Sequence, residues 1–161
     1  MNFFIRLLGR FFGKGLNKNV EICNDVVAQN IALYLAKKFI PRFGEDTGCA
    51  LAAAVTNELF GRPPTNEKGR QFLEEKRELV ISHLKELKNE PRICEILKIV
   101  VSTRANVAYG TCKVTPEIIQ QTVKLKEIGI LSSDKKVKLL TAPEELIEKV
   151  KEFELWVINQ N

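Results

Sequence analysis

The sequence has few of the residues that build metal and catalytic sites. It contains a single histidine, His83, and none of its cysteines forms a C-x-x-C pair (Cys23, Cys49, Cys94 and Cys112). A tetrahedral zinc site would therefore have to draw its ligands from unrelated segments. The sequence predicts no metal site, no cofactor and no catalytic residue.

Long hydrophobic runs are also missing. No apolar stretch reaches the ~18 to 20 residues that a membrane-spanning helix needs. Arg6 and Arg10 interrupt the only stretch that could serve as the apolar core of a secretory signal. The first serine is Ser82, whereas cleaved transit peptides are rich in serine. These absences favour a cytoplasmic protein with free thiols, with a peripheral place at a membrane left open.

The composition and the pattern of apolar residues predict an all-α fold. A chain of 161 residues with 45% hydrophobic residues can bury one core. We expect a single-domain bundle of about six to seven helices, with a small β-hairpin near residues 130–140. The chain divides into an N-terminal amphipathic basic helix, 1–16, and a helical globular domain, 17–161.

Proline, glycine and capping residues predict the ends of these helices. We expect a turn at 16–19 and a first domain helix that begins at Val20 or Asp25 and is stopped by Pro41. Asp46 and Thr47 are expected to cap the next helix. The remaining helices are expected at about 66–87, from Pro91 to Gly110, from Pro116 to Gly129, and from Pro143 onwards.

The opening stretch, MNFFIRLLGRFFGKGL, is the most distinctive part of the sequence. On a helix its apolar side chains share one broad face, and the arginines lie opposite with a lysine at the boundary; the set is Phe3, Phe4, Leu7, Leu8, Phe11, Phe12, Arg6, Arg10 and Lys14. No acidic residue precedes Glu21, so the first twenty residues carry four of the net +5 charges.

Such a face must be covered by another surface, because exposed aromatic residues promote aggregation. The cover can be the protein's own domain, a second copy, a protein partner or an anionic membrane surface. The sequence therefore predicts a non-catalytic interaction or scaffold protein that docks to a protein partner or a membrane through residues 1–16.

A second hypothesis concerns residues 113–141. A helix that starts at Thr115-Pro116, a Gly-Ile-Leu turn and a lysine-rich stretch resemble the last helix and wing of winged helix-turn-helix domains. The resemblance implies DNA binding through phosphate contacts from the lysines of this segment, namely Lys124, Lys126, Lys135, Lys136 and Lys138.

A third hypothesis concerns residues 74–78. Glu74-Glu75-Lys76-Arg77-Glu78 resembles the E-E-x-x-E motif of the all-α nucleotide pyrophosphatases. The resemblance implies a nucleotide hydrolase whose glutamates hold Mg²⁺.

One cysteine is a candidate reactive thiol. Cys49 falls in the first turn of an expected helix, where the helix dipole can lower the pKa of a thiol. The alternative is a small side chain packed against a neighbouring helix. His83, on the charged helix, is expected to be partly exposed.

Overall fold

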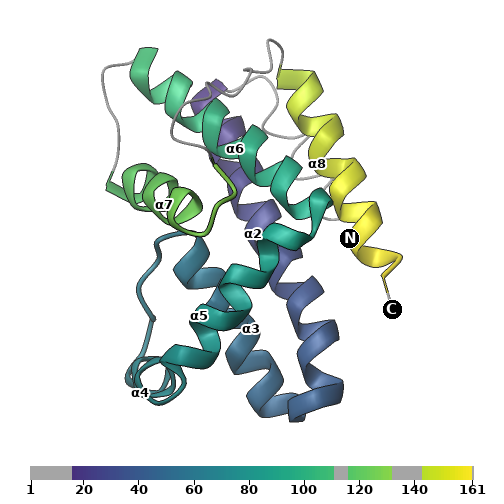
Figure 1. Cartoon of the computed structure of the whole chain (residues 1–161). Coiled ribbons are helices and arrows are strands. Elements are labelled where there is room, and N and C mark those ends of the chain that lie inside the picture. Colours follow the sequence, from purple (N-terminus) through teal and green to yellow (C-terminus); the bar gives the residue numbers. More distant parts are fainter. Residues whose placement is uncertain (1–15, 111–115, 132–142, 161) are drawn as a thin grey trace.

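The computed structural model describes residues 16–110, 116–131 and 143–160, and most of these residues are helical (Figure 1). The elements are α2 (Leu16–Phe43), α3 (Glu45–Leu59), α4 (Glu67–Glu75), α5 (Arg77–Glu86), the 3₁₀ turn η1 (Leu87–Asn89), α6 (Pro91–Gly110), α7 (Pro116–Glu127) and α8 (Pro143–Ile158). The all-α prediction is confirmed. The expected hairpin falls mainly on 132–142, outside the described residues, and Ile130 and Leu131 form a bend rather than a strand.

Helix α2 is the centre of the fold and packs against α3, α6 and α8. Its expected inner positions are all buried: Val27, Ile31, Tyr34, Leu35 and Phe39. The expected turn at 16–19 and the stop at Pro41 are both wrong, because α2 runs through both. Pro41 lies in the last turn, where a proline removes only one helical hydrogen bond. The helix ends instead at Gly44, whose φ of 87° suits glycine.

The corner between α2 and α3 depends on Gly48. A Cβ atom on Gly48 would lie 2.7 Å from the backbone nitrogen of Ile40, so only glycine allows the two backbones to approach this closely. The expected cap at Asp46 and Thr47 is shifted, since Gly44 is the N-cap and Asp46 lies in the first turn. An acidic residue there is favourable for the helix dipole.

The expected helix over 66–87 is two helices. The start near residue 66 agrees with the structure, where Asn66 caps α4 and its side chain accepts a hydrogen bond of 2.8 Å from the amide of Gly69. The chain then leaves helical geometry at Lys76, with φ −112° and ψ 19°. No residue of α4 is buried, whereas α5 buries Val80 and Leu84. Because of this break, α5 packs its buried residues into the core, whereas α4 lies on the surface.

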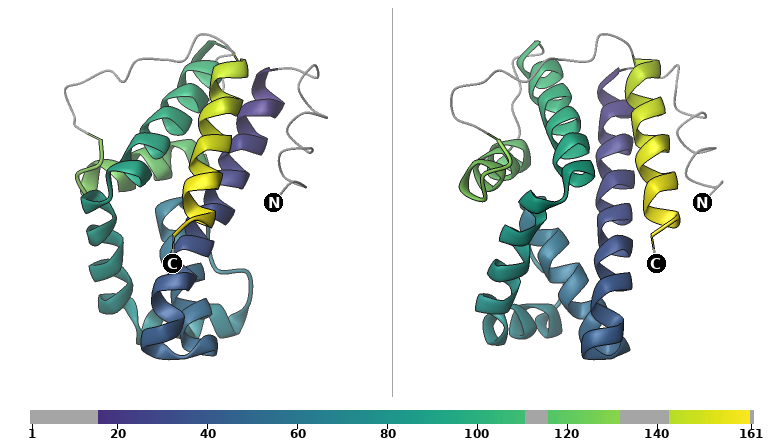
Figure 2. Two further views of the ribbon diagram at one scale, coloured as in Figure 1. Left: turned by 90° about the vertical axis from the view of Figure 1, so that its right-hand side faces the viewer. Right: turned by 45° about the vertical axis from the view of Figure 1, so that its right-hand side comes forward.

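Helix α8 lies beside α2, and the two helices start at the same end of the molecule (Figure 2). The rings of Tyr34 and Trp156 stack with centroids 5.3 Å apart. Among the described residues, no helix is both long and apolar enough to cross a bilayer.

Candidate functional site

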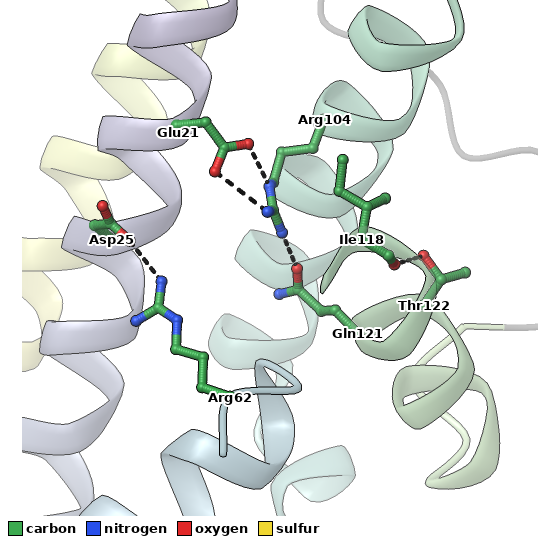
Figure 3. A network of polar contacts seen from close by, with 7 residues as sticks. All are labelled: Glu21, Asp25, Arg62, Arg104, Ile118, Gln121 and Thr122. Atoms are coloured by element: carbon green, nitrogen blue, oxygen red, sulfur yellow. Dashed lines mark hydrogen bonds and ion pairs between the residues drawn. The ribbon is translucent and has the colours of Figure 1, made fainter. Parts of the chain in front are cut away.

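A network of polar contacts in the described domain centres on Arg104 of α6 (Figure 3). This side chain is only 5% exposed. Its guanidinium donates to both carboxylate oxygens of Glu21 on α2, at 2.9 and 3.2 Å. The third bond goes to the amide oxygen of Gln121 on α7. One buried cation therefore ties three helices together.

A second ion pair lies beside this network. Arg62, just after α3, pairs with Asp25 of α2 (Figure 3). A cleft of about 170 Å³ adjoins both pairs and is lined by Glu21, Asn24, Phe60, Arg62, Arg104 and Glu117. The space suits a few water molecules or a small polar group.

Two buried groups at this site lack a hydrogen-bond partner among the described residues: the side-chain oxygen of Asn24 and the amide nitrogen of Gln121. An unsatisfied buried polar group costs about 1 to 3 kcal/mol. The guanidinium of Arg104 is already paired with Glu21 and Gln121. We therefore regard the network as a structural clamp on α7 rather than a reaction centre.

Cys49 lies elsewhere, on the exposed side of α3. It lines an open groove of about 640 Å³ between α3 and α4, together with Ala50, Ala53, Ala54, Phe72 and Leu73. The alternative of a packed cysteine is wrong, since Gly48 makes the close contact and Cys49 is exposed.

His83 is buried, not partly exposed as expected. Its ring lies 4.6 Å from that of Phe39 and 6.2 Å from that of Phe43, measured between centroids. Its Nδ1 atom lies 3.2 Å from a carboxylate oxygen of Glu86. The histidine fills the corner between α2 and α5, and it does not line the Cys49 groove.

The lysines of the winged-helix hypothesis are only partly described. Lys124 forms ion pairs with Glu58, at 3.7 Å, and with Glu127, at 3.4 Å. Lys126 is exposed on α7, and Lys135, Lys136 and Lys138 lie outside the described residues. Helix α6, which precedes this segment, is 20 residues long.

The glutamates of the nucleotide-hydrolase hypothesis are split by the break at Lys76. Glu74 and Glu75 end α4, and Glu78 belongs to the first turn of α5. Within the described ranges, no group of three or more histidine, cysteine, aspartate or glutamate residues is arranged to hold a metal ion.

The predicted docking residues 1–15 lie outside the described residues. The domain to which they are joined is described, and α2 begins at Leu16. One feature of that domain was not predicted from the sequence: Glu154, on α8, is 0% exposed. The sequence signal was present, because a single acidic residue interrupts the apolar stripe of α8. The same holds for Arg104 in the apolar α6.

Comparisons with protein-family models, with curated proteins and with solved structures find no match to this chain. A proposal about function therefore depends on the residues themselves.

Proposed function

We propose that the protein is a non-catalytic interaction protein that docks to a protein partner or an anionic membrane through residues 1–16. The observation that carries the proposal is the joint presence of four phenylalanines and three cations in an acid-free stretch. Apolar burial and attraction of cations to an acidic surface act together in such a segment.

The described domain supports this proposal by what its polar residues do. Arg104 and Arg62 hold helices together, and the ring of His83 is packed between phenylalanines. Cys49 has no histidine in its groove, and a nucleophilic cysteine needs a base within hydrogen-bond reach.

The test compares the wild-type chain with a variant in which Phe3, Phe4, Phe11 and Phe12 are all serine. Both are expressed in the source cells, and the lysate is separated by size and by sedimentation of membranes. We expect wild-type protein in a large complex or the membrane fraction, and the variant in the monomer fraction. A matched control replaces Ile119 and Val123, which are 52% and 48% exposed on α7, with serine. The proposal fails if wild-type protein and the phenylalanine variant both run as free monomers.

Synthetic vesicles distinguish a membrane from a protein partner. Wild-type protein that sediments with vesicles containing phosphatidylserine, but not with vesicles of phosphatidylcholine alone, has an anionic membrane as its target. The Arg6→Gln, Arg10→Gln, Lys14→Gln variant should then lose most of its binding, because each cation near the surface contributes about 1 kcal/mol.

The two alternative functions have separate tests. A DNA-binding role predicts retention on a DNA column that falls steeply as salt rises; the lysines concerned are Lys124, Lys126, Lys135, Lys136 and Lys138. A role for Glu74, Glu75 and Glu78 in nucleotide hydrolysis predicts heat release when Mg²⁺ and a nucleotide are mixed with the protein.

A further inference from the structure

The small cleft beside the Arg104 network contains an unsatisfied buried amide. Its lining comes from α2, from the end of α3 with the loop that follows, from α6 and from α7. Asn24 of α2 belongs to this lining and is only 3% exposed, and its side-chain oxygen accepts no hydrogen bond from the described residues. Buried acceptors without a donor are rare in folded proteins. A molecule that brings a donor into this cleft would therefore satisfy Asn24.

Two guanidinium groups of the same cleft have donors to spare. Figure 3 shows both of them, from Arg62 and Arg104, turned toward the acidic residues of α2. An arginine side chain carries five N–H donors. In its contacts with described residues, Arg104 uses three of them, two on Glu21 and one on Gln121. Arg62 uses one, on Asp25. The remaining donors suit a carboxylate, which matches the planar geometry of a guanidinium.

The balance of charge at the cleft disfavours a simple anion. Arg104 is neutralised by Glu21, and Arg62 is neutralised by Asp25. Glu117, in the first turn of α7, also lines the cleft, and its carboxylate pairs with no cation of the described residues. One negative charge is therefore left over. It repels a phosphate or sulfate ion and attracts an ammonium group.

We propose that this cleft binds a small zwitterion of the α-amino acid class. The ammonium group of the ligand binds the oxygen of Asn24 and the carboxylate of Glu117. Its carboxylate binds the remaining N–H groups of Arg62 and Arg104. At roughly 30 Å³ per water-sized unit, the cleft has room for about five or six non-hydrogen atoms, which is the size of glycine or alanine. The site lies in the described domain, so this inference goes beyond the docking function proposed for residues 1–16 and does not depend on it.

Each end of the ligand meets one buried and one exposed partner. Asn24 and Arg104 are 3% and 5% exposed, whereas the side chain of Arg62 is 39% exposed and Glu117 is exposed as well. A ligand can therefore enter from solvent past the exposed pair and reach the buried pair. The hydrogen bonds to the buried pair are the stronger ones, because the local dielectric constant is lower there.

The first test is an NMR titration of the full-length, ¹⁵N-labelled protein. The probes are glycine and L-alanine, and the matched single ions are methylammonium, acetate and inorganic phosphate. We expect the side-chain amide signals of Asn24 to shift and saturate with either amino acid. The single ions should bind at least about tenfold more weakly, because each lacks one set of charge-assisted hydrogen bonds. No shift with either amino acid would overturn the proposal, and so would a single ion that binds as tightly as alanine.

The second test uses variants and calorimetry with the same amino acids. Asn24→Leu and Glu117→Gln should each weaken binding by about tenfold or more, since each removes a hydrogen bond to the ammonium group. The matched control for the first is Asn30→Leu, because Asn30 lies on α2, is also 3% exposed and does not line the cleft. This control should bind like the wild-type chain.

The Glu117→Gln variant decides the matter even if Asn24→Leu fails to fold, because Glu117 is exposed. Equal affinity of Glu117→Gln and the wild-type chain would overturn the proposal. A loss of binding in Asn30→Leu as large as that in Asn24→Leu would also overturn it, because the effect would then not belong to the cleft.

Discussion

The clamp at Arg104 gives a prediction whose size follows from the structure. Arg104→Ala leaves the side-chain oxygen of Gln121 buried without a donor, which costs about 1 to 3 kcal/mol. It also removes the packing of the buried arginine stem, for about 1 kcal/mol more. Glu21 is 52% exposed, so water can replace the guanidinium at that end. We expect a loss of about 2 to 4 kcal/mol in the free energy of unfolding.

Equilibrium unfolding in urea measures this loss. The midpoint should fall by about 1 to 2 M, given a urea dependence of about 2 kcal/mol per M, the middle of the usual range. The matched control is Arg70→Ala, which removes a pair in which Arg70 and Glu67 are 62% and 69% exposed and should cost at most about 0.5 kcal/mol. If the two variants lose the same stability, the reasoning about the buried clamp is wrong. The Arg104→Lys variant should lose an amount of stability between the losses of Arg104→Ala and Arg70→Ala. An ammonium group cannot reproduce the planar set of donors with which the guanidinium binds Glu21 and Gln121.

Three further predictions follow from the fold. Gly48→Ala should cost about 1 to 3 kcal/mol in urea unfolding, because its Cβ would collide with the backbone of α2; an unchanged midpoint would exclude that close approach. Burial raises the pKa of Cys23 to about 12, so iodoacetamide at pH 8 should alkylate Cys49 in native protein and leave Cys23 unmodified until unfolding, as peptide mapping can check. Burial raises the pKa of the Glu154 carboxyl, so the folded state binds a proton more tightly than the unfolded state and stability should fall as pH rises through that pKa; in Glu154→Gln this fall should be absent.

The sequence was sufficient for the parts of the fold that depend on local signals. Apolar periodicity placed the inner positions of α2, and Asn66 marked the start of α4. The sequence-based prediction ended the helix at Pro41, because a proline usually marks a helix end. In the structure Pro41 lies within the last turn of α2, and the helix ends before Gly44. The break at Lys76 has no local signal, because it follows from the contact of α5 with the core.

The contacts that join distant segments could not be predicted from one sequence. Arg104 and Glu21 are 83 positions apart, and nothing near either residue identifies the other. What the sequence does offer is the presence of a polar residue on an apolar stripe, as at Arg104 and Glu154. Only the packing of α2 and α6 shows that Arg104 has a partner, and only the surroundings of α8 show that Glu154 lacks one among the described residues.

The central claim is that residues 1–16 are the docking element, and photo-crosslinking at Phe4 tests it most directly. A benzophenone analogue of phenylalanine is placed at position 4 of the full chain in the source cells, with position 144, on the exposed first turn of α8, as the control site. We predict crosslinks from position 4 to a partner protein or to lipid, above the level at the control site. An internal crosslink alone, or no crosslink above the control, would contradict the docking function.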